Sequence, residues 1–314
     1  MKKLKLKAAG VLAGALLSAN ALAADKVTLL LDWFINPDHG PLIVAQQKGY
    51  FAEQDLEVEM QEPADPSMPP KLVAAGKADM AVSYQPQLHV QVDEGLPLTR
   101  VGTLVATPLN SLIVLQSSDI KSIKDLKGKK VGYSVGGFED ALLKAMLKQQ
   151  GLSLEDIEMV NVNWSLSPSL IAGKVDAVIG AYRNFELNQM DIEGHPGRAF
   201  YVEEQGVPAY DELVLVVNNK DRDDPKYGRF VKALEKATQY IVNHPDAAWE
   251  SFKSYKKDLD NELNKRAWAD TLTRFALRPA ALDEARYQRV GAFMQAQGLT
   301  RANPDVATYA IEPK

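Results

Sequence analysis

The chain has 314 residues, of which 46% are hydrophobic and 25% charged, with 20 Gly, 17 Pro and no Cys. This composition is that of a globular protein, and the length suits about two domains of roughly 150 residues each. The absence of Cys excludes disulfides, thiolate metal sites, iron–sulfur clusters and Cys nucleophiles. With 36 Lys and Arg against 41 Asp and Glu, the charge balance is not that of a protein that neutralises phosphate backbones. We therefore expect no nucleic-acid partner.

The first 23 residues have the pattern of a secretory signal peptide. Four Lys precede an apolar run over residues 8–17, and the segment ends in an A-x-A cleavage site at residues 21–23. A membrane-spanning helix needs about 20 apolar residues, roughly twice this run. Cleavage is expected after Ala23, and removal of the four Lys leaves 32 basic against 41 acidic residues, a net charge of −9. The expected product is a protein of the bacterial periplasm, without a lipid anchor because no Cys is present to carry one.

In chain order, the rest of the sequence alternates short apolar, β-branched runs with helical stretches. The expected strands are residues 26–31, 56–60, 79–82, 101–105, 111–115, 130–133, 159–162, 176–180 and 213–217. The expected helices are residues 40–49, 67–75, 227–242, 245–255, 261–275 and 282–297. The repeated β-α-β order at the start predicts an α/β fold with parallel pairing.

The order of these elements also indicates two lobes. A new cycle begins at residues 122–133 (SIKDLKGKKVGY), a short helix closed by Gly128 and followed by a strand. Two strand-rich crossings, near 111–115 and 212–217, indicate that the chain enters a second lobe and returns. We expect lobe 1 to comprise residues 24–112 and 214–314, with a mostly helical C-terminal region, and lobe 2 to comprise residues 113–213.

Ligands of open α/β sheets bind outside the carboxyl ends of the strands. Trp33 follows the first expected strand and Tyr84 follows the third, so each ring is placed either to stack on a flat heterocycle or to serve as a core or cleft-wall aromatic. Asn36 and His39 share the loop of Trp33. Their side chains are suited to hydrogen-bond a ring edge or to cap the helix that follows.

Further along the chain, Tyr182 and Glu186 lie four residues apart, a spacing that places them on one face of a helix. A carboxylate that reaches into a partly dry cleft accepts a hydrogen bond from an exocyclic amine. The alternative for Glu186 is a solvated helix residue.

The segment SVGGF, from Ser134 to Phe138, follows a strand and opens a helix. Gly136 and Gly137 allow close backbone approach, so the loop offers N–H groups to an anion or a polar substituent. However, Glu139 and Asp140 follow at once and compete for those donors, which favours a neutral ligand.

Several segments of the chain resemble a known family. They are LLDWFINPDHGPLIVAQQKGYF (30–51), LVAAGKADMAV (72–82), KDLKGKKVGY (124–133) and DAVIGAYRNFEL (176–187). Together with the signal peptide, they resemble type II periplasmic solute-binding proteins of ABC importers. Within that class they resemble the ThiY-like branch, which binds thiamine-type pyrimidines and shares its scaffold with the yeast-type pyrimidine synthases.

The resemblance implies a monomeric receptor without a cofactor, served by an inner-membrane permease and its ATPase. It implies formylaminopyrimidine or hydroxymethylpyrimidine as the ligand, with Trp33 in the ligand stack and Glu186 on the amino group. Pyridoxal phosphate, or another flat heterocycle, is the alternative ligand, because the matching Gly-rich loop of the synthases holds a phosphate.

Enzyme functions are less well supported by the sequence. Where the synthases carry a cofactor-binding Lys and a His four residues later, this chain has Ser83 and Gln87, and it lacks their Cys cluster. His89 lies two residues out of register and is expected on a helix surface.

A hydrolase is the second enzyme alternative. Residues 132–136 (GYSVG) match G-x-S-x-G, with Ser134 as nucleophile and His195 and His244 in the chain order of a triad. The expected two-lobed order does not suit that fold, so we expect a binding protein rather than an enzyme. No metal is expected either, because the four His form no H-x-x-x-H pair.

Overall fold

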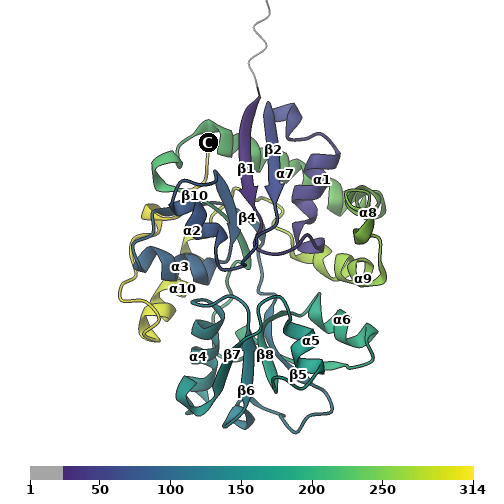
Figure 1. Cartoon of the computed structure of the whole chain (residues 1–314). Helices are drawn as coiled ribbons and strands as arrows, with labels where there is room; N and C mark the ends of the chain where they lie inside the picture. Colours follow the sequence, from purple (N-terminus) through teal and green to yellow (C-terminus); the bar gives the residue numbers. More distant parts are fainter. Residues whose placement is uncertain (1–23) are drawn as a thin grey trace, which may run out of the picture.

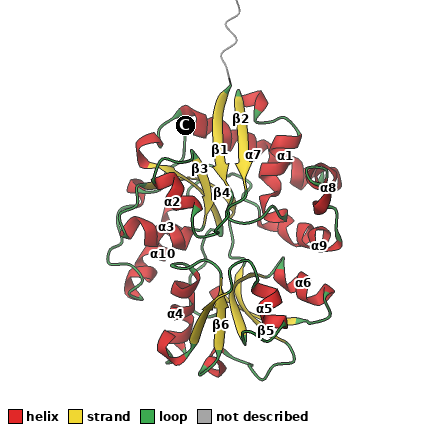
Figure 2. Ribbon diagram, viewed as in Figure 1, coloured by secondary structure: helices red, strands yellow, loops and turns green. Residues whose placement is uncertain are grey.

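The computed structural model describes residues 24–314, which form two lobes, one above the other in Figures 1 and 2. The predicted signal peptide and its cleavage site lie outside the described residues. Within residues 24–314, no helix is both long and apolar enough to cross a membrane. Each lobe is an α/β unit built on one five-stranded sheet, which confirms the predicted fold class.

The sheet of the first lobe mixes parallel and antiparallel strands. Its order is β2 (Leu56–Gln61), β1 (Asp25–Leu30), β3 (Met80–Ser83), β10 (Leu213–Asn218) and β4 (Leu98–Val105). β1 is parallel to β2 and β3 because helices α1 (Gly40–Gln47) and α2 (Pro69–Ala74) return the chain to the same end of the sheet. β10 is antiparallel to both neighbours, since it arrives from the other lobe.

The sheet of the second lobe repeats this plan. Its order is β7 (Glu158–Asn161), β6 (Lys130–Tyr133), β8 (Ala177–Tyr182), β5 (Asn110–Leu115) and β9 (Gly197–Tyr201). β6 is parallel to β7 and β8, whereas β5 is antiparallel to its neighbours. The helices of this lobe are α4 (Glu139–Gln149), α5 (Leu166–Ile171) and α6 (Glu186–Ile192). β5 and β10 are the crossing strands of their sheets, and each occupies the fourth position in its order.

The remaining helices all cover the first lobe (Figure 1). They are α3 (Gln85–Asp93), α7 (Pro225–Asn243), α8 (Pro245–Lys253), α9 (Glu262–Thr271) and α10 (Glu284–Ala296). The longest, α7, begins at Pro225 after the cap residue Asp224, whose carboxylate accepts the N–H of Lys226. Its apolar positions recur every three or four residues, so one face packs on α1 and stacks Phe230 on Phe51, ring centroids 4.8 Å apart.

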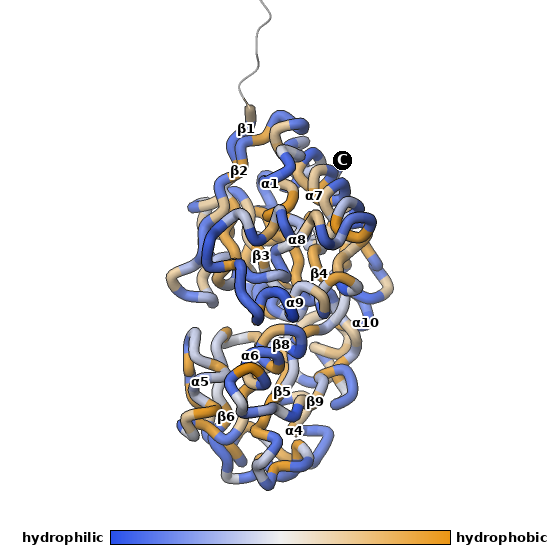
Figure 3. Tube along the Cα trace, turned by 90° about the vertical axis from the view of Figure 1, so that its right-hand side faces the viewer, coloured by the Kyte–Doolittle hydropathy of each residue, from blue (hydrophilic) through white to orange (hydrophobic). Residues whose placement is uncertain are grey.

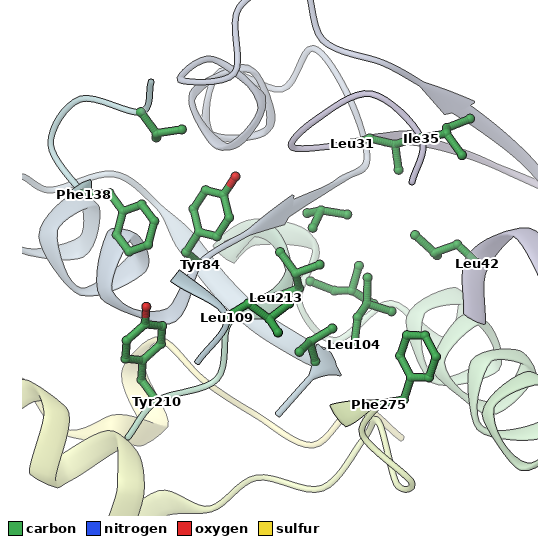
Figure 4. Packing of buried hydrophobic residues seen from close by; sticks show 14 of the residues in the cluster. Leu31, Ile35, Leu42, Tyr84, Leu104, Leu109, Phe138, Tyr210, Leu213 and Phe275 are labelled. Carbon is green, nitrogen blue, oxygen red and sulfur yellow. The ribbon is translucent and has the colours of Figure 1, made fainter. Parts of the chain in front are cut away.

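The largest apolar cluster runs through both lobes and includes residues at their junction, such as Leu109 and Leu213 (Figure 4). The chain leaves the first sheet after β4, enters the second at Asn110 and returns at Leu213. We propose that the lobe limits lie in these two connections, a few residues from the limits expected from the sequence.

The structure corrects the expectation for His89. This side chain is 5% exposed on α3, with its ring 5.2 Å from that of Tyr309 and 6.0 Å from that of Tyr287. α10 and the C-terminal segment cover α3, and the sequence of α3 alone carries no sign of that cover.

Candidate functional site

A narrow inner pocket with a cavity volume of about 30 Å³ lies between the lobes. Its walls come from the carboxyl ends of β1 and β3 in the first lobe and of β6 and β8 in the second. This is where ligands bind in open α/β sheets. A second cavity of about 470 Å³ lies farther out between the lobes and shares Trp33, Leu166, Phe185 and Glu186 with the first.

The first wall of the pocket is fixed by Asp32. Its Oδ1 lies 2.9 Å from Nε2 of the fully buried His39, and its Oδ2 accepts the Tyr84 hydroxyl at 2.9 Å. Nδ1 of His39 accepts the N–H of Asn36 at 3.3 Å, which assigns the hydrogen of the neutral ring to Nε2. Both nitrogens of His39 are therefore held by the protein, and this side chain serves the capping role that the sequence left open.

Asn36 also has a structural role. It caps the 3-10 turn Pro37–His39: its Oδ1 accepts the N–H of Asp38 at 2.8 Å, and its Nδ2 donates to the carbonyl of Phe34 at 3.2 Å. Asn36 still lines the pocket.

Aromatic pairs join the two lobes around the pocket. The rings of Tyr84 and Phe138 are stacked, with centroids 4.5 Å apart and planes 6° apart, as the close-up in Figure 4 shows. On the outer side, Trp33 contacts Trp164 of the second lobe at 4.4 Å. Flat rings from the two lobes thus contact one another on both sides of the pocket.

A buried carboxylate lies at the centre of the second lobe's wall. Glu139 opens α4, and its Oε2 accepts the N–H of Ser134 at 2.7 Å. The carboxyl group lies directly over Gly180 of β8, where a Cβ would stand no more than 2.5 Å from either oxygen. Burial raises the pKa of Glu139 to about 8.

Tyr182 and Glu186 do not share a helix face, contrary to the expectation from their spacing. Tyr182 ends β8 and Glu186 begins α6. They meet because the turn between them folds back, so that Oε2 of Glu186 accepts the N–H of Tyr182 at 2.6 Å. Glu186 is 7% exposed, and burial raises its pKa to about 8.

The two connections between the lobes are tied together beside the pocket. Oε2 of Glu212 accepts the backbone N–H groups of Leu109 and Asn110 at 2.5 and 2.9 Å, and Oε1 accepts the Tyr182 hydroxyl at 3.3 Å. Arg286 of α10 donates to the carbonyl of Ala106 at 2.8 Å in one connection.

Arg286 also pairs with Asp211 in the other connection. The two connections between the lobes are therefore held by charged groups, and the Tyr182 hydroxyl links them to the pocket.

Seven of the ten predicted site residues line the pocket, namely Trp33, Asn36, His39, Tyr84, Phe138, Tyr182 and Glu186. Ser134, Gly136 and Gly137 do not. The two glycines form an exposed turn with Gly137 at φ +80°, and the Ser134 N–H is taken by Glu139. The carboxyl groups of the lining, those of Asp32, Asp38 and Glu139, were not among the predicted site residues, nor was Trp164 in the outer cavity.

The triad expected of a hydrolase is not formed. The hydroxyl of Ser134 donates to the backbone carbonyl of Asn163, and neither His195 nor His244 contacts it. His195 lies in the turn before β9, and His244 caps α8 in the other lobe.

The fold is that of the periplasmic binding proteins. A protein of Candida albicans described as exhibiting the generic periplasmic binding protein structural fold superposes with a TM-score of 0.72. The two share 19% identity over 93% of this chain and 97% of that chain. Residues 36–248 match the family described as NMT1/THI5 like, and the chain belongs to this family.

Proteins with similar sequences agree with this family assignment. A putative thiamine biosynthesis protein of Haemophilus influenzae is 57% identical over 95% of this chain and 96% of its own length. The formylaminopyrimidine-binding protein of Halalkalibacterium halodurans is 36% identical over 72% of this chain and 69% of its own. A 4-amino-5-hydroxymethyl-2-methylpyrimidine phosphate synthase of Saccharomyces cerevisiae is 31% identical over 79% and 76%.

Proposed function

We propose that this protein is the periplasmic receptor of an ABC importer for a thiamine-type aminopyrimidine, formylaminopyrimidine or hydroxymethylpyrimidine. The protein acts as a monomer whose two lobes close on the ligand. The closed form is then presented to an inner-membrane permease and its ATPase. The name of the Halalkalibacterium relative supports the ligand class. The observation that carries the proposal is the set of buried carboxyl groups in the pocket lining.

The lining holds four carboxyl groups and, among residues 24–314, no Lys or Arg. They are Asp32, Asp38, Glu139 and Glu186, and all four are at least nine-tenths buried. Buried carboxyl groups need hydrogen-bond donors, and an amine on a flat ring supplies them. A phosphate would instead bring negative charge beside these groups without a cation to balance it. The lining therefore favours an aminopyrimidine over pyridoxal phosphate.

The synthase function of the yeast relative receives no support from the corresponding positions. Ser83 and Gln87 stand where the resemblance places the Lys and His of the synthases, and the Ser83 hydroxyl donates to Oε1 of Gln87 at 2.9 Å in a buried pair. These two side chains satisfy one another and supply neither an amine nor an imidazole.

The test is a thermal-unfolding screen of residues 24–314, stripped of ligand, against formylaminopyrimidine, hydroxymethylpyrimidine, pyridoxal phosphate and thiamine. A ligand at about 100 times its Kd adds about 2.7 kcal/mol of stability, which raises Tm by about 5–10 °C for a protein of this size. A rise with the pyrimidines supports the proposal. A rise with pyridoxal phosphate alone would replace the ligand, and no rise with any of the four would overturn the proposed ligand class for this protein.

Glu186→Gln tests whether this side chain recognises the amine of the ligand. An N–H donor of the ligand favours the ionised form of Glu186, which Gln cannot adopt. Affinity for hydroxymethylpyrimidine should therefore fall by about 10- to 100-fold. Glu193→Gln, at the exposed end of the same helix, is the matched control and should bind as the unaltered protein does. Unchanged affinity in Glu186→Gln would remove this residue from the site.

A further inference from the structure

Asp38 carries an oxygen that no protein group uses. Its side chain, 1% exposed, lies in the turn after β1 and lines the inner pocket. Oδ1 accepts the side-chain amide of Asn184 at 2.6 Å and the hydroxyl of Thr271 at 3.2 Å. Oδ2 is buried and has no hydrogen-bond partner within the described part of the chain.

The group that orients this carboxylate comes from the opposite lobe. Asn184 lies between β8 and α6 in lobe 2, whereas Asp38 and Thr271 belong to lobe 1. The side chain of Asn184 is 2% exposed, so its bond to Asp38 is shielded from water. The orientation of Oδ2 thus depends on the lobes being together.

The same face of lobe 2 makes two more polar contacts with α9, which lies above α6 in Figure 3. Asn188 donates to Asp270 at 2.8 Å, and Asp191 pairs with Arg266 at 2.8 Å. Both pairs are exposed and contribute little by themselves. Among these contacts, the Asn184–Asp38 bond is the one that reaches the pocket.

Asp38 and Glu186 line the same pocket from opposite lobes. An exocyclic amine on a pyrimidine is planar and points its two N–H bonds in different directions. In a dry site each N–H needs an acceptor of its own, because an unpaired donor loses its bond to water without replacement.

We propose that Asp38 is a specificity-determining residue: its free Oδ2 accepts one N–H of the ligand's exocyclic amine while Glu186 accepts the other. This inference rests on the proposed function and names the chemistry that the site selects. A pyrimidine with an oxo group at that position would place a carbonyl against Oδ2, two acceptors facing each other. The site therefore distinguishes aminopyrimidines from oxopyrimidines.

Asp38→Asn tests the proposal, because Asn keeps the size and keeps an oxygen for Asn184 while replacing Oδ2 by a donor. By calorimetry, hydroxymethylpyrimidine should bind about 10- to 100-fold more weakly, and its 4-oxo analogue should bind as well as, or better than, it binds the unaltered protein. Asn184→Ala removes the amide that donates to both Asp38 and Thr271. It leaves Oδ2 without a fixed orientation, so the preference for hydroxymethylpyrimidine over the 4-oxo analogue should fall. Equal losses for both ligands in Asp38→Asn, or no loss, would overturn the proposal.

A second measurement needs no variant. The analogue methylated on the amine keeps a single N–H, so the unaltered protein should bind it at least about 10-fold more weakly than the parent. Equal affinity for the methylated analogue and the parent would show that the site recognises only one N–H, and it would overturn the role of Asp38. If the unaltered, folded protein binds neither formylaminopyrimidine nor hydroxymethylpyrimidine, the proposed function itself fails. If it binds hydroxymethylpyrimidine but shows none of these differences between ligands, only the role of Asp38 fails.

Discussion

Gly180 is the position at which a single methyl group should disturb the pocket most. It lies in β8 at φ +94°, a conformation that residues with a side chain rarely adopt. In Gly180→Ala, the backbone strain is worth about 1–2 kcal/mol. The Cβ also displaces the Glu139 carboxyl group, which then loses the N–H of Ser134, a further loss of about 1.5–3 kcal/mol.

Together these terms predict a destabilisation of about 3–5 kcal/mol, which lowers Tm by about 6–20 °C in a chain of this size. Thermal or urea unfolding measures it. The matched control is Gly95→Ala, because Gly95 has φ +92° but its Cβ would have no atom within 4 Å. The loss of stability in this control should therefore come from backbone strain alone.

The reasoning about the carboxyl group is refuted if Gly180→Ala is no less stable than Gly95→Ala. A double-mutant cycle adds a second check. Shortening Glu139 to Ala in the Gly180→Ala protein removes the group that the Cβ meets, so the two losses should be clearly less than additive.

Two further outcomes are expected. Because the pKa values of Glu139 and Glu186 are raised to about 8, the folded state keeps protons that the unfolded state releases near pH 4.3. The stabilising contribution of these two groups is full below that pH and is lost as pH rises through 8. The urea midpoint should therefore fall between pH 6.5 and pH 8.5, and it should fall less in Glu139→Gln. A midpoint that rises over this range would contradict the raised pKa values. Arg286→Gln leaves the buried Asp211 without its cation and should cost about 3 kcal/mol in unfolding free energy, whereas Arg289→Gln, on an exposed position of α10, should change it by less than about 0.5 kcal/mol.

The sequence predicted those parts of the fold that depend on local patterns. β1, β3 and β6 were expected within a residue or two because each is a short apolar run bounded by turns. Trp33 and Tyr84 were found as pocket residues because the residues after parallel strands gather at one edge of a sheet. The two strand-rich crossings predicted the two-lobed plan, and the relatives confirm the family resemblance.

The parts that the sequence did not reveal are those made by the two lobes together. Asp38 has the pattern of a polar turn residue along the chain, and its bond to Asn184 comes from the facing lobe. Glu139 was expected to compete for the donors of the Ser134 loop, and it does accept the N–H of Ser134, but the sequence does not show that its carboxyl group is buried over Gly180 of β8. Trp164 reaches Trp33 from a loop in which Asn163 takes φ +50°. Such a loop conformation has no periodic sequence pattern, so the site's carboxylates and its outer aromatic contact required the three-dimensional arrangement.

The position of β10 has a consequence for how the chain folds. The strand lies between β3 and β4, yet more than a hundred residues separate it from β4 along the chain. Until β10 arrives, β4 has no strand neighbour in this sheet and β3 is paired only with β1. Lobe 2, whose sheet comes from one continuous stretch, pairs residues at most 90 positions apart (Ser111 with Tyr201), against 120 positions for Leu98 and Asn218 in lobe 1. We therefore expect lobe 2 to fold early, and lobe 1 to fold slowly because its long-range strand pairing comes last.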